Sequence, residues 1–484
     1  MGGYYPFALI FCIFLKGGLN FMKGFKNKEF LPTMIMMAVP ITIQSFITSS
    51  LNLVDNLMVG KLGEESIASV GLANQYIFIF TLCILGINAG ASVFMSQFWG
   101  KKDLKNIKKV LGLDISIGLI VSTLFALGSG FFSYEIMEIL SNDLNVIELG
   151  SKYLQIVSVS CIFTNFTQAY SSALRSTEQP SVPMYASIVG VLINAFLNWV
   201  FIFGNLGFDP MGVNGAALAT TIARLVEMIF IVSFVYFRKN KVASRLNELI
   251  SFDLNFVKIY FRTSWSVIVN EIVWSLGMTA YSIAYARIGT NAVASMQIAT
   301  TLNNMFMVLL IGLATASSIM IGNKIGSNEE EIAREYAKNI AVIAVLVGFI
   351  LGILIWITAP LALKPFNVSE GTYLDTVKVL RIIGLFFTIR AFNMVMIVGV
   401  FRGGGDTTYS MLVQCGTIWL YAVPMAFLGA TVFSLPVYGV YFLICTEEFL
   451  KIIFEAVRLK SGKWIKNVIS DIEEDESDNN LITV

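Results

Sequence analysis

The sequence predicts an all-α integral membrane protein with twelve transmembrane helices in two six-helix lobes. Three observations predict this class: the composition, the length of the apolar runs and an internal repeat. Of the 484 residues, 56% are hydrophobic and 13% are charged, whereas about 25% are charged in an average soluble domain. Apolar runs of about 20 residues are long enough to cross a bilayer as helices.

Twelve runs are long enough to be spans. They cover residues 31–58, 67–98, 110–133, 150–174, 182–204, 213–237, 257–286, 293–322, 339–360, 376–401, 408–432 and 437–459. Several exceed the length that a bilayer requires, which indicates tilted helices or helices that extend beyond the membrane.

The two halves of the chain repeat at a constant offset. The stretch from Gly63 recurs 226 positions later at Gly289, and Gly100 recurs at Gly326 with the same offset. A single offset held over more than 100 residues indicates a duplication. Because each half has an even number of spans, the halves share one orientation and are expected to be related by a pseudo-two-fold axis along the membrane normal.

The repeat and the loops predict five regions. These are an N-terminal extension with a basic segment at 1–30, a lobe at 31–237, a cytoplasmic linker at 238–256, a second lobe at 257–459 and an acidic cytoplasmic tail at 460–484. We expect the first 21 residues to be dispensable, with Met22 as the working start. Lysine and arginine are concentrated in alternate loops, so the positive-inside rule places both termini in the cytoplasm. We expect a multi-pass plasma-membrane protein that is a monomer, embedded in the lipid bilayer, with no nucleic-acid partner.

Several chemistries are excluded. Histidine is absent, which removes histidine metal sites, histidine-dependent triads and imidazole relays. The five cysteines are scattered through apolar segments and are expected to be core residues, not metal ligands. No P-loop is present, so ATP does not drive the protein directly. We therefore expect no enzyme activity and no cofactor, and no metal beyond a possible Na⁺.

Asp55 is the main candidate site residue. It lies in the first span, about two turns before the turn at Gly60, where a charge costs about 2.5–3.5 kcal/mol. An intramembrane carboxylate is a candidate ion or substrate site; the alternative is an inert structural carboxylate. Its counterpart in the repeat is Tyr281, so the carboxylate is not a shared requirement of the fold.

Three polar residues join it in the first half. Asn194 and Asn198 are four apart and therefore share one face of a helix, and Thr220 follows in the small-residue stretch that opens the sixth span. With Asp55 they offer oxygen ligands for Na⁺, or the carboxylate alone binds H⁺. The alternative for the asparagines is hydrogen bonding between helices. Gln44 is a further candidate for the lining of the site.

The second half holds a weaker set. Glu271 and Tyr281 lie in the seventh span, Glu271 near its middle, and Arg390 and Asn393 lie one turn apart in the tenth. Glu271 is either a protonation or cation site, or a structural partner of Arg390. Two other groups are expected to be self-contained ion pairs, namely Arg224 with Glu227, and Glu447 and Glu448 with Lys451.

The segments AVPITIQSF, NLVDNLMVGKLG, GVNGAALATTIAR and VFRGGGDT resemble the multidrug and toxic compound extrusion (MATE) transporters of prokaryotic type. Together with ALRSTEQPSVPM, LINAFLNWVFIFGN and NEIVWSLGMTAYSIAYARIG, the matches cover nearly all of residues 31–459 in order. The resemblance implies two lobes and cation-coupled antiport of small organic cations. It assigns family cation-site positions to Asp55, Asn194, Asn198 and Thr220. It also implies a glutamate in the seventh span, which Glu271 matches, and an aspartate in the tenth, where this chain has none.

The expected function is export of organic, cationic and amphipathic compounds in exchange for H⁺ or Na⁺ by alternating access. A flippase for a lipid-linked precursor is the alternative within the same superfamily. A membrane-embedded enzyme would require clustered catalytic residues at one membrane face, and the sequence shows none. A passive channel fits a duplicated bundle with unequal carboxylates less well.

Overall fold

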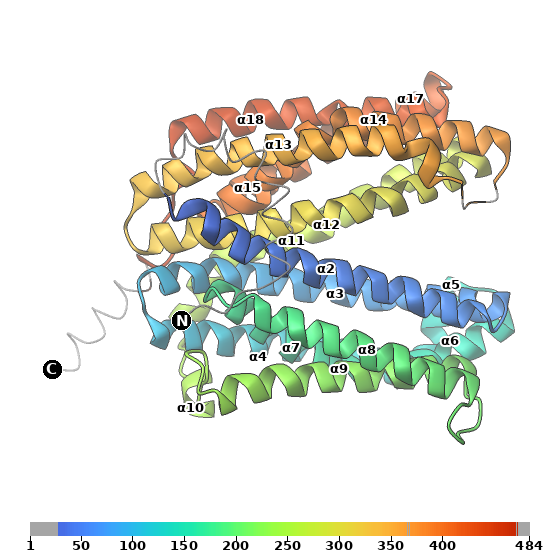
Figure 1. Cartoon of the computed structure of the whole chain (residues 1–484), viewed down its shortest axis with the longest axis horizontal. Helices are drawn as coiled ribbons and strands as arrows, with labels where there is room; N and C mark the ends of the chain where they lie inside the picture. Colours follow the sequence, from blue (N-terminus) through green and yellow to red (C-terminus); the bar gives the residue numbers. More distant parts are fainter. Residues whose placement is uncertain (1–27, 365, 367, 471, 473–484) are drawn as a thin grey trace. The chain divides into compact units, whose positions relative to one another are not determined.

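The computed structural model describes residues 28–364, 366, 368–470 and 472. The first 21 residues, which we expect to be dispensable, lie outside these ranges. Most of the expected acidic tail also lies outside them. Within them the chain is helical apart from short turns, loops and one isolated bridge between Gly405 and Ile465; most helices are α-helices, and the segments labelled η are π-helices. Figure 1 shows the long helices of each half running side by side.

The helices of the first half are α2 (Phe30–Gly60), α3 (Glu64–Gly100), α4 (Leu104–Phe131), α5 (Ser133–Leu140), α6 (Leu144–Val157), α7 (Ser160–Ser176), α8 (Ser181–Phe203) and α9 (Gly212–Phe237). A short helix, α10 (Leu246–Leu249), lies in the linker. The second half contains α11 (Leu254–Ile288), α12 (Thr290–Gly326), α13 (Glu330–Ala362), α14 (Glu370–Met394), η2 (Val395–Phe401), α15 (Thr407–Thr417), η3 (Ile418–Ala422), α16 (Val423–Phe427), η4 (Leu428–Val432), α17 (Val437–Cys445) and α18 (Glu447–Ser461).

This is an all-α membrane protein, as the sequence predicts. Among the described residues, ten helices are long and apolar enough to cross a membrane, and eleven if the bent pair α6–α7 is one crossing. The span expected at 150–174 corresponds to α6 and α7, which meet at an angle of 48°. The twelfth expected span corresponds to α17 and α18, where charged residues interrupt the apolar run.

The helix boundaries confirm the internal repeat. Helices α3 and α12 are both 37 residues long, and each begins just after the glycine of the repeated turn. Those glycines, Gly63 and Gly289, have φ of 114° and 142°, a conformation that side chains with a Cβ rarely adopt. Helices α4 and α13 begin at residues 104 and 330, again 226 positions apart. The duplicated sequence therefore specifies the same turn and the same helix starts twice.

The chain divides into two compact units. The first-half unit contains Gln44–Val273 and the described residues from Val468 onward. The second-half unit contains the described residues up to Ile43 and Trp274–Asn467. The unit boundaries fall inside α2 and α11, so each of these two helices contributes residues to both units. These are the first helices of the two repeats.

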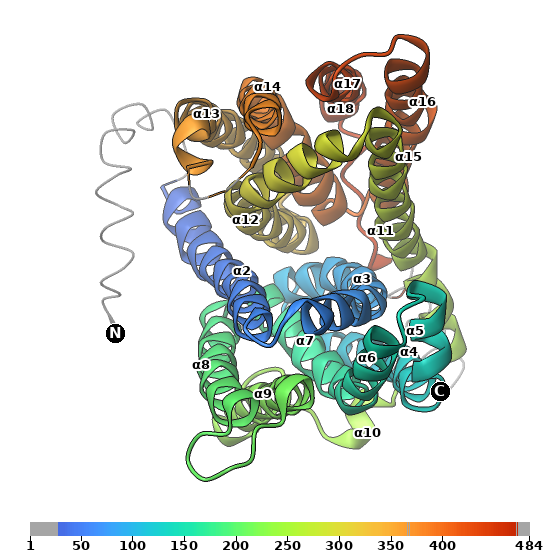
Figure 2. The same cartoon turned by 90° about the vertical axis from the view of Figure 1, so that its right-hand side faces the viewer.

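Each unit holds one pair of closely packed antiparallel helices, α8 with α9 and α13 with α14 (Figure 2). Glycine makes the approach possible. A Cβ at Gly215 of α9 would lie 2.7 Å from the backbone of Phe201 of α8, and Gly352 and Gly384 face each other across α13 and α14. Small residues let membrane helices approach until their backbones touch. In the first-half unit, this approach is what brings the polar residues of α8 and α9 together.

The linker packs on the end of α4. The backbone of Leu249 lies so close to Gly112 that no Cβ fits there. Lys108 Nζ lies 2.9 Å from Glu248 Oε1, and the Arg245 amide donates to Glu248 Oε2 over 2.7 Å. The Arg245 amide and the Lys108 ammonium hold the pKa of Glu248 below its usual range. The linker is therefore an ordered part of the first-half unit.

The chain after α18 also enters the fold. Trp464 is buried in the core of the second-half unit beside helices α12 and α13. Ile469 and Ile472 are buried in the core of the first-half unit, and the Val468 amide donates to Gln97 Oε1 over 2.9 Å. The region expected as a tail from residue 460 thus begins with a segment that contributes to both cores.

Candidate ion-binding site

Asp55 lies in the last third of α2, within the first-half unit, and its side chain is half-buried. Its Oδ1 accepts a hydrogen bond of 2.6 Å from Nδ2 of Asn198. Hydrogen bonds to an ionised carboxylate are stronger than those between neutral groups. The contact joins α2 to α8, and it makes the Asp55 carboxylate part of a polar site between helices.

The site continues along α8 and across to α9. Asn198 Nδ2 also lies 2.9 Å from Asn194 Oδ1, and Asn194 Nδ2 lies 3.3 Å from Thr220 Oγ1. Both asparagines are fully buried. The four side chains, Asp55, Asn198, Asn194 and Thr220, form one continuous chain of hydrogen bonds. The structure therefore brings together all four residues of the first-half candidate set.

One oxygen among these four hydrogen-bonded side chains has no hydrogen bond of its own. Asn198 directs its amide nitrogen toward both Asp55 and Asn194, and its Oδ1 has no partner among the described residues. A buried acceptor without a partner costs about 1–3 kcal/mol. If the amide rotated by 180°, its oxygen would face the Asp55 and Asn194 oxygens, and three oxygens around one point suit a cation.

A small cavity adjoins the site. It has a volume of about 10 Å³ and is lined by Asn194 and Thr220 together with Arg224, Glu227 and Ser187. A cavity of this volume admits one water-sized occupant when polar groups surround it. The polar chain that begins at Asp55 therefore ends beside a space of the size of a water molecule or a small ion.

A second network lies on the other side of this cavity. Glu227 is buried and accepts from Ser187 Oγ over 2.9 Å and from Arg224 Nη1 over 2.8 Å. Gln44 donates to Ser187 Oγ over 3.2 Å and accepts from Arg175 Nη1 over 3.3 Å. The expected Arg224–Glu227 ion pair is confirmed. Gln44 lies in this second network and not in the hydrogen-bond chain of Asp55.

The second-half candidates do not all belong to one unit. Tyr281 is buried on α11, and its hydroxyl has no hydrogen-bond partner among the described residues. Asn393 of α14 donates from Nδ2 to the carbonyl oxygen and to Oε2 of Glu448, both over 2.8 Å. Arg390 lies within electrostatic range of Glu447 and Glu448. These acids of α18 provide Arg390 with negative charge inside its own unit. Glu271 lies half-buried on α11 in the first-half unit.

Two buried carboxylates were not among the predicted site residues. Asp114 of α4 and Glu455 of α18 are 1% and 0% exposed, and neither has a hydrogen-bond partner among the described residues. Both lie inside predicted spans, so the signal that identified Asp55 also applied to them. Within the described part of the chain, no group of three or more Cys, Asp or Glu side chains is placed to hold a metal ion.

Comparison with known proteins identifies the class. The family model described as MatE matches residues 40–200 and 266–428, more than half of the chain. Together with the helical fold, this match defines a multi-pass membrane transporter of prokaryotic type and not an enzyme. The chain belongs to the MatE family, which confirms the resemblance seen in its sequence motifs.

Individual relatives agree with this assignment. "Probable multidrug resistance protein YoeA" of Bacillus subtilis (strain 168) is 25% identical over 414 residues, which cover 84% of this chain and 89% of the relative. "Probable multidrug resistance protein NorM" of Thermotoga maritima is 24% identical over 460 residues, which cover 93% and 97%.

Solved structures show the same fold. The structure described as "Outward-facing conformation of a multidrug resistance MATE family transporter of the MOP superfamily" has a TM-score of 0.82 and 21% identity, covering 89% of this chain and 96% of the other. A MOP superfamily transporter from Pyrococcus furiosus has a TM-score of 0.81 with the same identity and coverage. The twelve helices in two lobes predicted from the sequence are consistent with these structures.

Proposed function

We propose that this transporter exports organic, cationic and amphipathic compounds in exchange for H⁺ or Na⁺, and that Asp55 binds the coupling ion. The observation that carries the proposal is the 2.6 Å contact between Asp55 Oδ1 and Asn198 Nδ2. This contact begins a row of hydrogen-bonded side chains that runs from Asp55 to Thr220, and Thr220 lines the small cavity. The names of the curated relatives, which are described as probable multidrug resistance proteins, support the choice of substrate class.

Both coupling ions are compatible with this chemistry. For H⁺, the proton binds a carboxylate oxygen of Asp55 and neutralises its charge, so the contact with Asn198 becomes a weaker neutral hydrogen bond. For Na⁺, the Asn198 amide rotates and presents its oxygen, so that Asp55, Asn194 and Asn198 supply oxygen ligands. In either case the loaded and empty sites favour different packings of α2 against α8.

Coupling then follows from differential affinity. An ion drives a conformational change only by binding one state more tightly than the other. The outward-facing state binds the ion at Asp55 and releases the exported compound. The empty carboxylate favours the inward-facing state, which loads the next compound. We also propose that both termini are cytoplasmic and that a monomer is the working unit, with its two lobes as the moving parts.

The test is ethidium efflux from energised cells or everted vesicles, with an Na⁺ gradient and a pH gradient imposed separately. Asp55→Asn is expected to lower gradient-driven efflux about 5–150-fold, the range of a typical coupling free energy. Asp143→Asn is the matched control, because Asp143 is an exposed residue at the N-terminus of α6. Efflux driven by Na⁺ alone assigns a sodium site, and efflux driven by the pH gradient alone assigns a titrating carboxylate.

Normal efflux in a correctly inserted Asp55→Asn protein would refute the role of Asp55. If the unmodified protein shows no efflux under either gradient, the export proposal fails and the lipid-precursor flippase becomes the better hypothesis.

A further inference from the structure

Helix α18 carries a row of buried ionisable side chains that the proposed function does not use. Glu447, Lys451 and Glu455 follow each other at intervals of four residues, so they lie on one face of the helix. Their exposed fractions are 6%, 7% and 0%. Glu448, beside the first of them, is 8% exposed. Charged residues are almost never this buried unless they are paired.

Three of the four are paired. Lys451 Nζ lies 2.9 Å from Glu447 Oε1 and 3.6 Å from Glu448 Oε2, which confirms the ion pair expected from the spacing. Glu448 Oε2 also accepts from Asn393. Glu455 differs from its neighbours, because neither of its carboxylate oxygens has a hydrogen-bond partner among the described residues.

Glu455 is the carboxylate of this row that no cation or amide in the described part of the chain contacts. Counted with the end of α18, the described region has four carboxylates and four cations, since Asp406, Arg458 and Lys466 lie there beside the side chains already named. The contacts are unequal, however: Lys451 contacts Glu447 and Glu448, and Arg458 and Lys466 contact Asp406. A buried carboxylate without a contacting counter-charge is destabilising, and one bound proton removes that charge. The ammonium of Lys451, on the same face, opposes binding of a metal cation there.

Other helices of the second-half unit present polar or titratable groups to this cluster. They are Tyr281 of α11, Tyr409 of α15, Arg390 and Asn393 of α14, and Tyr441 and Cys445 of α17. Tyr409 lies within electrostatic range of both Glu455 and Asp406. Its hydroxyl donates to the Phe454 carbonyl oxygen over 2.9 Å.

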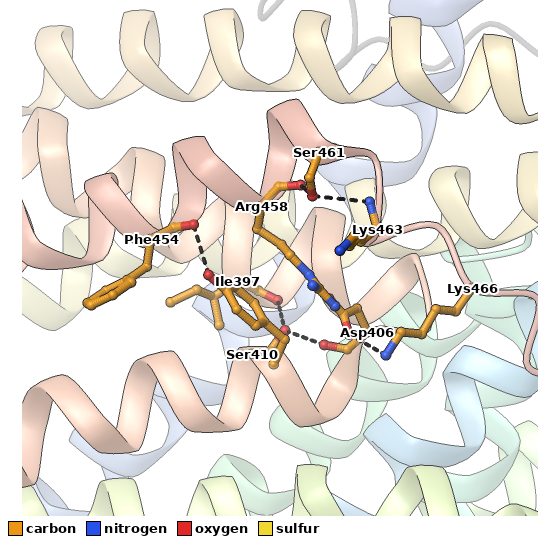
Figure 3. A network of polar contacts seen from close by, with 9 residues as sticks. Ile397, Asp406, Ser410, Phe454, Arg458, Ser461, Lys463 and Lys466 are labelled. Carbon is orange, nitrogen blue, oxygen red and sulfur yellow. Dashed lines mark hydrogen bonds and ion pairs between the residues drawn. The ribbon is translucent and has the colours of Figure 1, made fainter.

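At the end of α18 lies a further cluster of charged side chains, in which Arg458 and Lys466 point toward Asp406 (Figure 3). Arg458, three positions after Glu455, lies 2.7 Å from Asp406 Oδ2. Asp406 Oδ1 in turn lies 2.6 Å from Nζ of Lys466, whose side chain is 47% exposed. Glu455 is thus one helical turn from an ion-paired cluster that reaches water, and it is about 12 Å along the helix from Glu447.

We propose that Glu455 is a proton-binding site of the second-half unit, separate from Asp55, which exchanges its proton with solvent at the Lys466 end of α18. The proton binds a carboxylate oxygen of Glu455 and neutralises the one buried carboxylate of this row that contacts no cation among the described residues. Release of the proton to water restores the negative charge of Glu455, four positions after Lys451 and three before Arg458. The proposal goes beyond ion binding at Asp55 and does not depend on it.

The test is infrared spectroscopy of the purified full-length protein across a pH series, without substrate or gradient. A protonated buried carboxyl gives a C=O band that shifts in D₂O. Glu455→Gln is expected to remove one such band. The matched control is Glu331→Gln, because the Glu331 side chain is 94% exposed and its loss leaves the buried band in place. Asp114→Asn identifies the band of the other unpartnered carboxyl, and Asp55→Asn separates this proposal from the proposed function.

A buried-acid band that survives Glu455→Gln, with only the Asp114 or Asp55 variant removing it, would overturn the proposal. Addition of Na⁺ at constant pH is a second arm: loss of the Glu455 band would assign a metal-cation site instead. Glu455→Met covers the case in which the glutamine variant folds poorly. A neutral Glu455 predicts a thermal midpoint that is unchanged or raised in the methionine variant, whereas a clear fall would indicate an ionised, structural carboxylate.

Discussion

Asn198 Nδ2 and Asp55 Oδ1 lie 2.6 Å apart although 143 positions separate the two residues in the chain. The same nitrogen also donates to Asn194. One amide group therefore holds a carboxylate of α2 against an asparagine of α8.

Asn198→Ala is expected to lower both stability and efflux. The substitution removes two hydrogen bonds and leaves the oxygens of Asp55 and Asn194 without this donor, at a cost of about 1–3 kcal/mol. The measurement is the thermal midpoint in detergent together with ethidium efflux. Asn205→Ala is the control. Asn205 lies in the loop after α8 and donates one exposed hydrogen bond to the backbone carbonyl of Trp199. Equal effects of the two variants would contradict a special role for Asn198.

Glu227→Ala is expected to destabilise the protein by about 3–5 kcal/mol, since it leaves Arg224 facing a buried site without its anion. The double variant Arg224→Leu/Glu227→Leu removes both charges and is expected to be more stable than Glu227→Ala alone. Chemical or thermal unfolding of the set with the single variants Arg224→Leu and Glu227→Leu gives the coupling energy. If the single and double variants unfold alike, the pair contributes nothing to stability.

Gly112→Ala and Gly71→Ala are expected to act in opposite directions. A Cβ at Gly112 collides with the backbone of Leu249, whereas a Cβ at Gly71 of α3 meets no atom within 4 Å. The first variant is expected to lower the thermal midpoint and to expose the linker to protease. The second is expected to stabilise its helix by about 0.4–1 kcal/mol, because alanine restricts the unfolded chain. A protected linker in Gly112→Ala would show that α10 does not need this contact.

Asp406→Asn is expected to cost about 1.5–3 kcal/mol, because Arg458 and Lys466 lose the anion that both contact. Thermal unfolding at low and high salt measures the effect. Glu331→Gln, which removes a 3.9 Å surface pair with Arg334, is expected to change nothing measurable. A similar loss in both variants would mean that burial of Asp406 adds no strength to its ion pairs.

The repeat shows how one position acquires different chemistry in the two halves. Gln179 and Asn240 form a 2.7 Å hydrogen bond in the first-half unit. Asp406 and Lys466 lie 227 and 226 positions later and form an ion pair of 2.6 Å. The contact is present in both halves, but it joins two neutral side chains in the first half and two charged ones in the second. Asp55 differs from its counterpart Tyr281 in a similar way.

The sequence by itself determined the class, the helices and the repeat. Inside a bilayer every backbone amide and carbonyl must find a partner within the protein, so long apolar runs have to be helical. Repeated glycine turns then set the helix starts. The family resemblance added the candidate set of Asp55, Asn194, Asn198 and Thr220. Spacing along one helix also predicted the Arg224–Glu227 pair, because residues three or four apart are neighbours on a helix surface.

Only the tertiary structure decided which polar side chains of different helices meet. The way α2, α8 and α9 pack brings Asn198 to Asp55, and residue spacing along one helix does not predict how that helix is rotated against another. Spacing also does not predict which side chains are left without a partner. Lys451 and Glu455 have the spacing of an ion pair, yet Lys451 binds the glutamates before it in the chain. Packing leaves Glu455 buried without a partner, because burial and pairing are properties of neighbouring helices and not of one helix alone.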